Sequence, residues 1–116
     1  MDFERLEVWC RSSRLSCELY KALAQNRDYG FKDQITRSAV SIPSNIAEGM
    51  ERGSFKEKIN FLRYARGSCG ELRTQLYIGI NIGYLNKELG KQWLQETREI
   101  SSMLTGLMKA IEKQQL

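Results

Sequence analysis

The spacing of apolar residues constrains the fold of this chain more than any other feature of its sequence. Apolar side chains recur at alternating intervals of three and four residues, most regularly from Trp93 to Ile111. This spacing places them on one face of an α-helix. Stretches rich in glycine and polar residues interrupt the pattern. The sequence therefore predicts four helices, over residues 3–24, 32–52 and 54–82 and from Asn86 onward.

The lengths of the chain and of its connectors then limit how these helices assemble. The chain has 116 residues and no change of composition that would mark a linker, so one domain spanning residues 1–116 is expected. Short connectors force consecutive helices to run antiparallel. An apolar repeat of about 3.5 residues favours left-handed packing at shallow angles. We expect an all-α protein, a left-handed up-down-up-down four-helix bundle.

The single proline, Pro43, falls in the middle of the second predicted helix. A proline removes one backbone N–H and crowds the carbonyl group four residues earlier, which here is that of Ala39. Asn45 followed by Glu48 resembles a capping pair, which would suit a helix that stops and restarts. The apolar stripe, however, keeps its phase across Pro43. We therefore predict a continuous second helix that is kinked at Pro43.

Glycines are informative around and within the third helix. Gly53 and Ser54 mark a junction, because glycine suits the end of one helix and Ser54 with Glu57 forms a capping box for the next. Gly83 is expected to end the third helix. An interior glycine costs a helix up to about 1 kcal/mol relative to alanine. Close approach of another helix would explain this cost, and we predict it at Gly67, Gly70 and Gly79.

The composition argues against an enzyme and against a metal or cofactor site. The chain has no histidine, so the usual general base near neutral pH is absent. Its three cysteines show no Cys-x-x-Cys spacing, and no nucleophile–base pair or phosphate loop is visible. No apolar run is long enough to cross a membrane, and the first residues do not resemble a signal peptide. We expect a cytoplasmic, non-catalytic protein without a membrane span.

Basic residues line one side of the third predicted helix, and we call them the basic ridge. Two heptad-spaced pairs form it, and a fifth residue precedes the junction: Lys56 with Arg63, Arg66 with Arg73, and Arg52. The net charge of the chain is +4. Such a ridge could follow a phosphate backbone, with Tyr64 and Tyr77 available for base stacking. Two other interpretations stay open: ion pairs at a helix or subunit interface, and a solvated face.

The second predicted helix carries an unusual string, QITRSAVSIPSNIAEG at residues 34–49. With the motif LEVW at residues 6–9 and the motif GYL at residues 83–85, it resembles the four-helix-bundle proteins encoded in intervening sequences of bacterial 23S ribosomal RNA genes. The resemblance covers nearly the whole chain. It implies a left-handed bundle that assembles as a ring-like homopentamer, and a biochemical role that is largely unassigned. A more distant similarity in fold is to the accessory variability protein of diversity-generating retroelements, which binds nucleic acid.

We expect the conspicuous residues of this string to be structural. Arg37 and Glu48 lie on a segment that is otherwise poor in charge, and an ion pair or cap that fixes the kink is favoured over a buried polar binding site. The hydroxyl and amide groups near Pro43 are expected to satisfy backbone groups that the proline frees. The structural signature is Arg37, Pro43, Asn45, Glu48 and Gly49.

Together these features predict a non-catalytic homo-oligomer that binds RNA or DNA through the basic ridge. The family resemblance implies an association with ribosomal RNA. The alternative is a protein–protein adaptor or scaffold that does not bind nucleic acid. In this second hypothesis, the only activities are assembly and docking of a protein partner.

Overall fold

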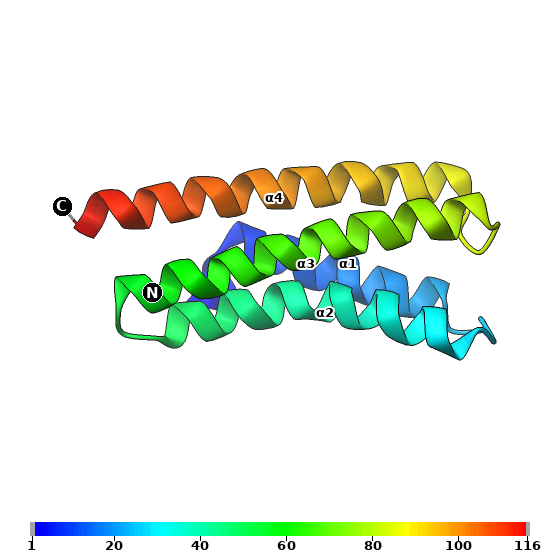
Figure 1. Cartoon of the computed structure of the whole chain (residues 1–116), viewed down its shortest axis with the longest axis horizontal. Coiled ribbons are helices and arrows are strands. Elements are labelled where there is room, and N and C mark those ends of the chain that lie inside the picture. The colour runs from blue at the N-terminus through cyan, green and yellow to red at the C-terminus, as the bar shows by residue number, and fades with distance from the viewer. Residues whose placement is uncertain (1, 116) are drawn as a thin grey trace.

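The computed structural model describes residues 2–115, and helices account for most of them. A short 3-10 helix, η1, precedes four α-helices that run alternately up and down along one long axis (Figure 1). The described body measures 48 × 21 × 20 Å. The predicted all-α, up-down arrangement is confirmed, whereas its left-handed twist stays a prediction. The elements are η1 (Phe3–Arg5), α1 (Glu7–Ala22), α2 (Tyr29–Glu51), α3 (Phe55–Asn81) and α4 (Lys87–Gln115).

Local caps define where three of the helices begin. The Ser54 hydroxyl accepts a hydrogen bond from the backbone N–H of Glu57 at 3.1 Å, and Asn86 Oδ1 accepts one from the N–H of Leu89 at 3.0 Å. Both predicted N-caps are thereby confirmed. Asp28 caps α2 in the same way, which is why α2 begins at Tyr29, three residues earlier than predicted. Gly83 follows α3 with a φ of 81°, the left-handed conformation expected of a residue that ends a helix.

The first helix begins later than its apolar pattern predicts. Residues Phe3–Arg5 form the separate 3-10 turn, and the extended backbone of Leu6 breaks the helix before Glu7. The ring of Phe3 packs edge-on against that of Trp9, with centroids 5.3 Å apart. The prediction of one helix from residue 3 is therefore wrong. The 3-10 turn still places the ring of Phe3 against Trp9 of α1.

The helix α2 runs without interruption from Tyr29 to Glu51, through the buried Pro43. The amide of Asn45 donates to the backbone carbonyl oxygen of Ser41 at 2.8 Å and to its Oγ at 3.1 Å. Asn45 therefore does not cap a restarted helix, and the prediction of a continuous helix is confirmed. The kink itself stays a prediction.

Glycines mark close contacts between elements, among them those at Gly49 and Gly79. A Cβ atom at Gly49 would lie 2.9 Å from Phe61 Cβ and 3.3 Å from the Lys58 carbonyl oxygen, and one at Gly79 would lie 2.9 Å from the ring of Phe31. The neighbours of Gly79 are the side chains of Phe31 and Leu85, so the contact there is tight but is not the predicted close approach of another helix backbone. The prediction is also wrong at two other positions, where a Cβ would meet nothing within 4 Å: Gly67 and Gly70. These two lie on the outer side of α3, where their cost to the helix is not offset by packing.

The core runs the length of the bundle between the four helices. The regular spacing of α4 buries Trp93, Thr97, Ile100, Leu104 and Ile111, as expected from the sequence. Of the neighbouring helix pairs, α2 and α3 share the most extensive contact, whereas α1 and α4 share the least. No helix in residues 2–115 combines the length and apolarity that crossing a membrane requires.

Candidate nucleic-acid interface

Two arginines of the basic ridge lean from α3 onto α4. Arg66 Nη1 donates a hydrogen bond to Thr105 Oγ1 at 3.1 Å, and Arg73 Nε donates one to Thr97 Oγ1 at 3.3 Å. Both arginine side chains are half-buried. Since each guanidinium group has further N–H donors, these bonds fix the position of the charge and leave donors free. Arg66 and Arg73 lie about 10.5 Å apart along the helix, as seven residues require.

The other two ridge residues of α3, Lys56 and Arg63, point to solvent. Arg63 lies one turn before Arg66, and Lys56 lies two turns before Arg63. Between Arg63 and Arg73, the exposed Gly70 has open space where a side chain would stand. The cations therefore border a stretch of bare helix backbone, which leaves room for a ligand to approach.

Helix α4 adds a cation to this surface that the sequence did not reveal. Arg98 Nη2 donates a hydrogen bond to the hydroxyl of Tyr77 on α3 at 2.7 Å. Figure 1 shows α4 lying along α3 over most of its length. The spacing of Arg98 and Thr105, one heptad apart, could have indicated a shared face of α4. Nothing in the spacing indicates that this face adjoins the ridge.

These residues form one surface, which we call the α3–α4 basic strip. No carboxylate of the described residues lies within 4.0 Å of its cationic groups, whereas Arg11, Arg37 and Arg52 elsewhere each have such a partner. Ion pairing, one of the alternatives for the ridge, therefore positions none of the ridge residues on α3 within the described part of the chain, whereas it does engage Arg52. The strip consists of Lys56, Arg63, Arg66, Arg73, Arg98 and the aromatic Tyr77.

Arg52 lies apart from the strip, in an ion-paired clamp at the turn between α2 and α3. Its guanidinium group contacts Glu48 at 2.7 Å and Glu57 at 3.1 Å. It also stands over the ring of Phe61, 5.1 Å from the centroid. The hydrogen bond to Glu48 is the main cause that raises the pKa of Arg52 above its ordinary value. These contacts link the end of α2 to the first turn of α3 through Arg52.

The charged residues of the signature string lie in two separate pairs. Arg37 contacts Asp33 at 2.9 Å, one turn earlier in α2, and Glu48 contacts Arg52. All four side chains are exposed. Arg37 and Glu48 therefore form neither a buried polar site nor a common ion pair at Pro43. Each is a surface pair between residues four apart, of a kind that contributes little to stability.

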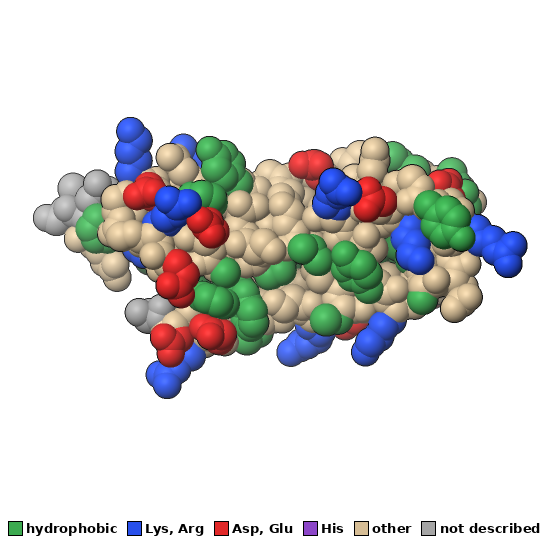
Figure 2. Space-filling view, turned by 90° about the horizontal axis from the view of Figure 1, so that it is seen from below, with side chains coloured by type: hydrophobic (Ala, Val, Ile, Leu, Met, Phe, Trp, Pro, Cys, Tyr) green, Lys and Arg blue, Asp and Glu red, His purple; other side chains and the backbone are tan. Residues whose placement is uncertain are grey.

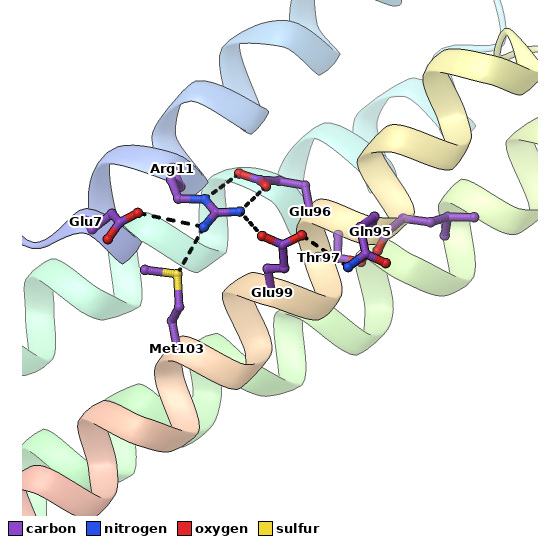
Figure 3. Close-up of polar contacts among 8 residues, drawn as sticks. Glu7, Arg11, Gln95, Glu96, Thr97, Glu99 and Met103 are labelled. Carbon is purple, nitrogen blue, oxygen red and sulfur yellow. Dashed lines mark hydrogen bonds and ion pairs between the residues drawn. The ribbon is translucent and has the colours of Figure 1, made fainter.

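A second polar cluster joins α1 to α4, and the sequence did not predict it. Figure 3 shows Arg11 of α1 pointing into a group of α4 side chains. Its Nε donates to Glu96 Oε2 at 2.9 Å, and its Nη2 contacts both Glu96 and Glu99, the latter at 2.7 Å. The bonds to Glu96 and Glu99 raise the pKa of Arg11, and Arg11 in turn lowers that of Glu99. These hydrogen bonds link α1 to α4.

An apolar groove of about 430 Å³ lies between α1 and α2. Figure 2 shows hydrophobic side chains along the middle of one face of the molecule, with charged side chains toward both ends and along the edges. The groove brings part of the signature string to the surface, next to the aromatic residues of the N-terminal region. Its lining includes Phe3, Trp9, Cys17, Val40, Pro43 and Ala47. Trp9 lines this groove beside Phe3, against whose ring it packs.

The three cysteines are free thiols that differ in exposure. Cys69 is buried, and the loss of solvent raises the pKa of its thiol to about 12, so it is protonated at neutral pH. The thiol of Cys10 donates to the carbonyl oxygen of Glu4 at 3.3 Å, and Cys17 is exposed. Within the described part of the chain, no three histidine, cysteine or carboxylate side chains are grouped as metal ligands.

Comparisons with known proteins agree with the fold and with the signature string. The profile of the protein family described as 23S rRNA-intervening sequence protein matches residues 4–106. A crystal structure of a protein of unknown function from the S23 ribosomal protein family of Bacteroides thetaiotaomicron is similar to this chain, with a TM-score of 0.82 and 26% sequence identity. The match covers 88% of this chain and 98% of that one. No curated protein shows significant similarity to the chain.

Proposed function

The chain belongs to the 23S rRNA-intervening sequence protein family, and from that premise we propose that it is a non-catalytic homo-oligomer that binds RNA or DNA through the α3–α4 basic strip. The observation that supports this most is the absence of carboxylate partners along the strip in residues 2–114, although the chain has 14 acidic residues. Cations that are left without anions on one surface favour an anionic ligand.

The geometry of the strip suits a ligand with repeated phosphates. The threonine hydroxyls of α4 hold Arg66 and Arg73 in place, so less side-chain entropy is lost when these residues bind. Arginine binds phosphate through paired N–H groups. The strip extends from Lys56 to Tyr77, which is about 31 Å of helix. This length spans several phosphates of one strand, so the affinity should depend strongly on salt.

Assembly into a homo-oligomer would place several copies of the α3–α4 basic strip on one particle. We propose a pentamer of left-handed bundles, each kinked at Pro43, as the family resemblance implies. The apolar groove between α1 and α2 is suited to a subunit contact, because it exposes Trp9, Val40 and Ala47 together. Several strips on one particle raise the effective concentration of binding sites along a single nucleic acid.

The proposal can be tested by fluorescence anisotropy with labelled structured RNA and duplex DNA, titrated over several salt concentrations. Changing Arg63, Arg66 and Arg73 to Glu lowers the net charge by six, from +4 to −2. We expect this variant to lose binding. A matched control changes the exposed residues Arg14, Lys21 and Arg27 to Glu and has the same net charge. The control should keep most of its affinity.

A milder variant separates loss of binding from loss of folding. Changing the same three arginines to Gln keeps hydrogen-bonding side chains on the half-buried positions. The magnitude of the slope of log K against log salt should then fall by about two to three, because three phosphate contacts are lost. Circular dichroism should show an unchanged helix content. Equal loss of binding in the control and the Arg-to-Glu variant would assign the effect to overall charge and reject the strip.

The apolar groove favours a second candidate, a protein–protein adaptor without nucleic-acid binding. A groove lined by Trp9, Val40 and Pro43 is a suitable site for an apolar side chain of a protein partner. This candidate predicts flat titrations with every nucleic acid at low salt. It also predicts that Val40→Glu removes a discrete protein from pull-downs. Recovery of RNA alone in that experiment would count against it.

A further inference from the structure

Tyr77 occupies an unusual position within the α3–α4 basic strip. Its side chain is 45% exposed, although it lies beside the boundary with α4. The hydrogen bond from Arg98 holds its phenol oxygen, so the ring stays in one orientation. An exposed aromatic ring that is fixed in this way is a preformed flat surface.

The surroundings of Tyr77 place cations next to that surface. Arg73 lies one turn earlier on α3, about 6 Å along the helix. Arg98 reaches the phenol oxygen from α4. Two turns before Tyr77, Gly70 leaves the helix surface open. A ligand that follows the strip from Lys56 thus meets cations, then the bare backbone at Gly70, then Arg73 and the ring of Tyr77.

We propose that the strip binds single-stranded nucleic acid, with one unpaired base stacked on the ring of Tyr77 and the adjoining phosphates held by Arg73 and Arg66. This inference rests on the proposed function and narrows its substrate class. The base stacks through its π face, which all four bases have, so little sequence preference is expected. Arg98 adds a cation at the edge of the same site.

A duplex would use this surface differently. Its bases are stacked on one another inside the helix, and it presents phosphates and groove edges to a protein. The arginines would serve such a ligand as well as a single strand. The ring of Tyr77 would then stack on no base and add little affinity. Substitution of Tyr77 therefore separates the two ligand classes, whereas substitution of the arginines does not.

The test compares a labelled uridine RNA of about 16 nucleotides with an RNA duplex of the same length, on the intact protein. In Tyr77→Ala, the Kd for the single strand should rise about tenfold, since each base stacked on an aromatic residue contributes that much. The Kd for the duplex should change less than about twofold. Tyr77→Phe keeps the ring and should retain most of the single-strand affinity. Arg98→Gln should show an intermediate loss.

Tyr64 provides the matched control. It is another exposed tyrosine of α3, 59% exposed. It lies about 140° away around the helix, because thirteen residues separate the two, and its ring packs edge-on against Phe61 with centroids 5.6 Å apart. Tyr64→Ala should leave both affinities unchanged. This result would show that the loss in Tyr77→Ala belongs to one position.

Three outcomes would overturn the inference. If Tyr77→Ala lowers the affinities for the single strand and for the duplex equally, Tyr77 does not stack on a base and only helps to hold the strip in place. If the wild-type protein binds the duplex more tightly than the single strand, the substrate class is wrong. In both cases the arginine variants would still lose binding, and the proposed function would stand. If the wild-type protein binds neither RNA, the inference fails, and the proposed function fails with it only if the titration with duplex DNA is flat as well.

Discussion

The contacts between α2 and α3 and between α1 and α4 hold the bundle together by different means. Between α2 and α3, Gly49 lets the helices approach until a single Cβ would collide with Phe61. Between α1 and α4, the contact is the least extensive of the neighbouring pairs and depends on long polar side chains. Arg11 spans to Glu96, and the indole N–H of Trp93 donates to Glu18 at 2.9 Å.

The α2–α3 and α1–α4 contacts therefore depend on different forces. Close apolar packing depends on shape, and it tolerates changes of salt and pH but not added volume. A contact made by charged side chains tolerates changes of volume and weakens when its charges are neutralised. The α2–α3 contact should therefore fail through steric clash, and the α1–α4 contact through acid.

The largest effect is expected from Gly49→Val, which adds volume to the close contact. The new Cβ would lie 2.9 Å from Phe61 Cβ and 3.3 Å from a backbone carbonyl oxygen, neither of which can move easily. We expect a loss of about 3 kcal/mol in the free energy of unfolding, measured by urea denaturation. Gly67→Ala is the control, since nothing lies within 4 Å of that position. It should raise stability by up to about 1 kcal/mol. An unchanged free energy of unfolding in Gly49→Val would show that the helices can separate there at little cost.

A smaller effect is expected from Arg11→Met, which removes the cation from the polar contact. The side chain of Arg11 is 22% exposed, and that of Glu96 is 25% exposed. A partly buried carboxylate would lose its partner, at a cost of about 1–2 kcal/mol in the free energy of unfolding. Arg37→Met removes the cation of a pair whose side chains are 78% and 63% exposed. Its cost should stay below about 0.5 kcal/mol. Equal effects of the two substitutions would mean that the Arg11 cluster is an ordinary surface pair.

The smallest effect concerns pH and Glu99. The hydrogen bond from Arg11, and secondly that from Gln95, lowers the pKa of Glu99 below its ordinary value of 4.5. A carboxyl group whose pKa is lower in the folded state adds stability above its ordinary pKa, and this stability is lost as the pH falls through the folded pKa. Urea midpoints between pH 7 and pH 3 should therefore fall less steeply in Arg11→Met than in the wild type. Parallel curves would show that Arg11 does not stabilise the ionised form of Glu99.

The sequence predicted the helices and their caps well because these depend on near neighbours. The side chains of Ser54 and Asn86 each accept a hydrogen bond from the backbone N–H three residues later. It predicted poorly the surroundings of isolated residues. Gly67 and Gly79 look alike in the sequence, but one lies in open space and the other against Phe31. The difference depends on which side of α3 faces α2, and the packing of the helices decides that.

The candidate site was predicted in part for the same reason. The heptad spacing indicated that Arg66 and Arg73 share one line of the helix, which is a local property. It could not show that Arg52 would be occupied by Glu48 and Glu57, because the path of the turn around Gly53 was undetermined. Nor could it show Arg98 beside Tyr77, 21 residues away.

The sequence by itself determined four amphipathic helices, their order, most of their ends and the grouping of cations on one side of α3. Only the tertiary structure decided which charges are paired, because pairing depends on the rotation and register of helices that are distant in the chain. Arg11 and Glu96 are 85 residues apart, and Arg66 and Thr105 are 39 apart. A shift of one turn, about 5.4 Å, would separate either pair without changing the pattern of any single helix.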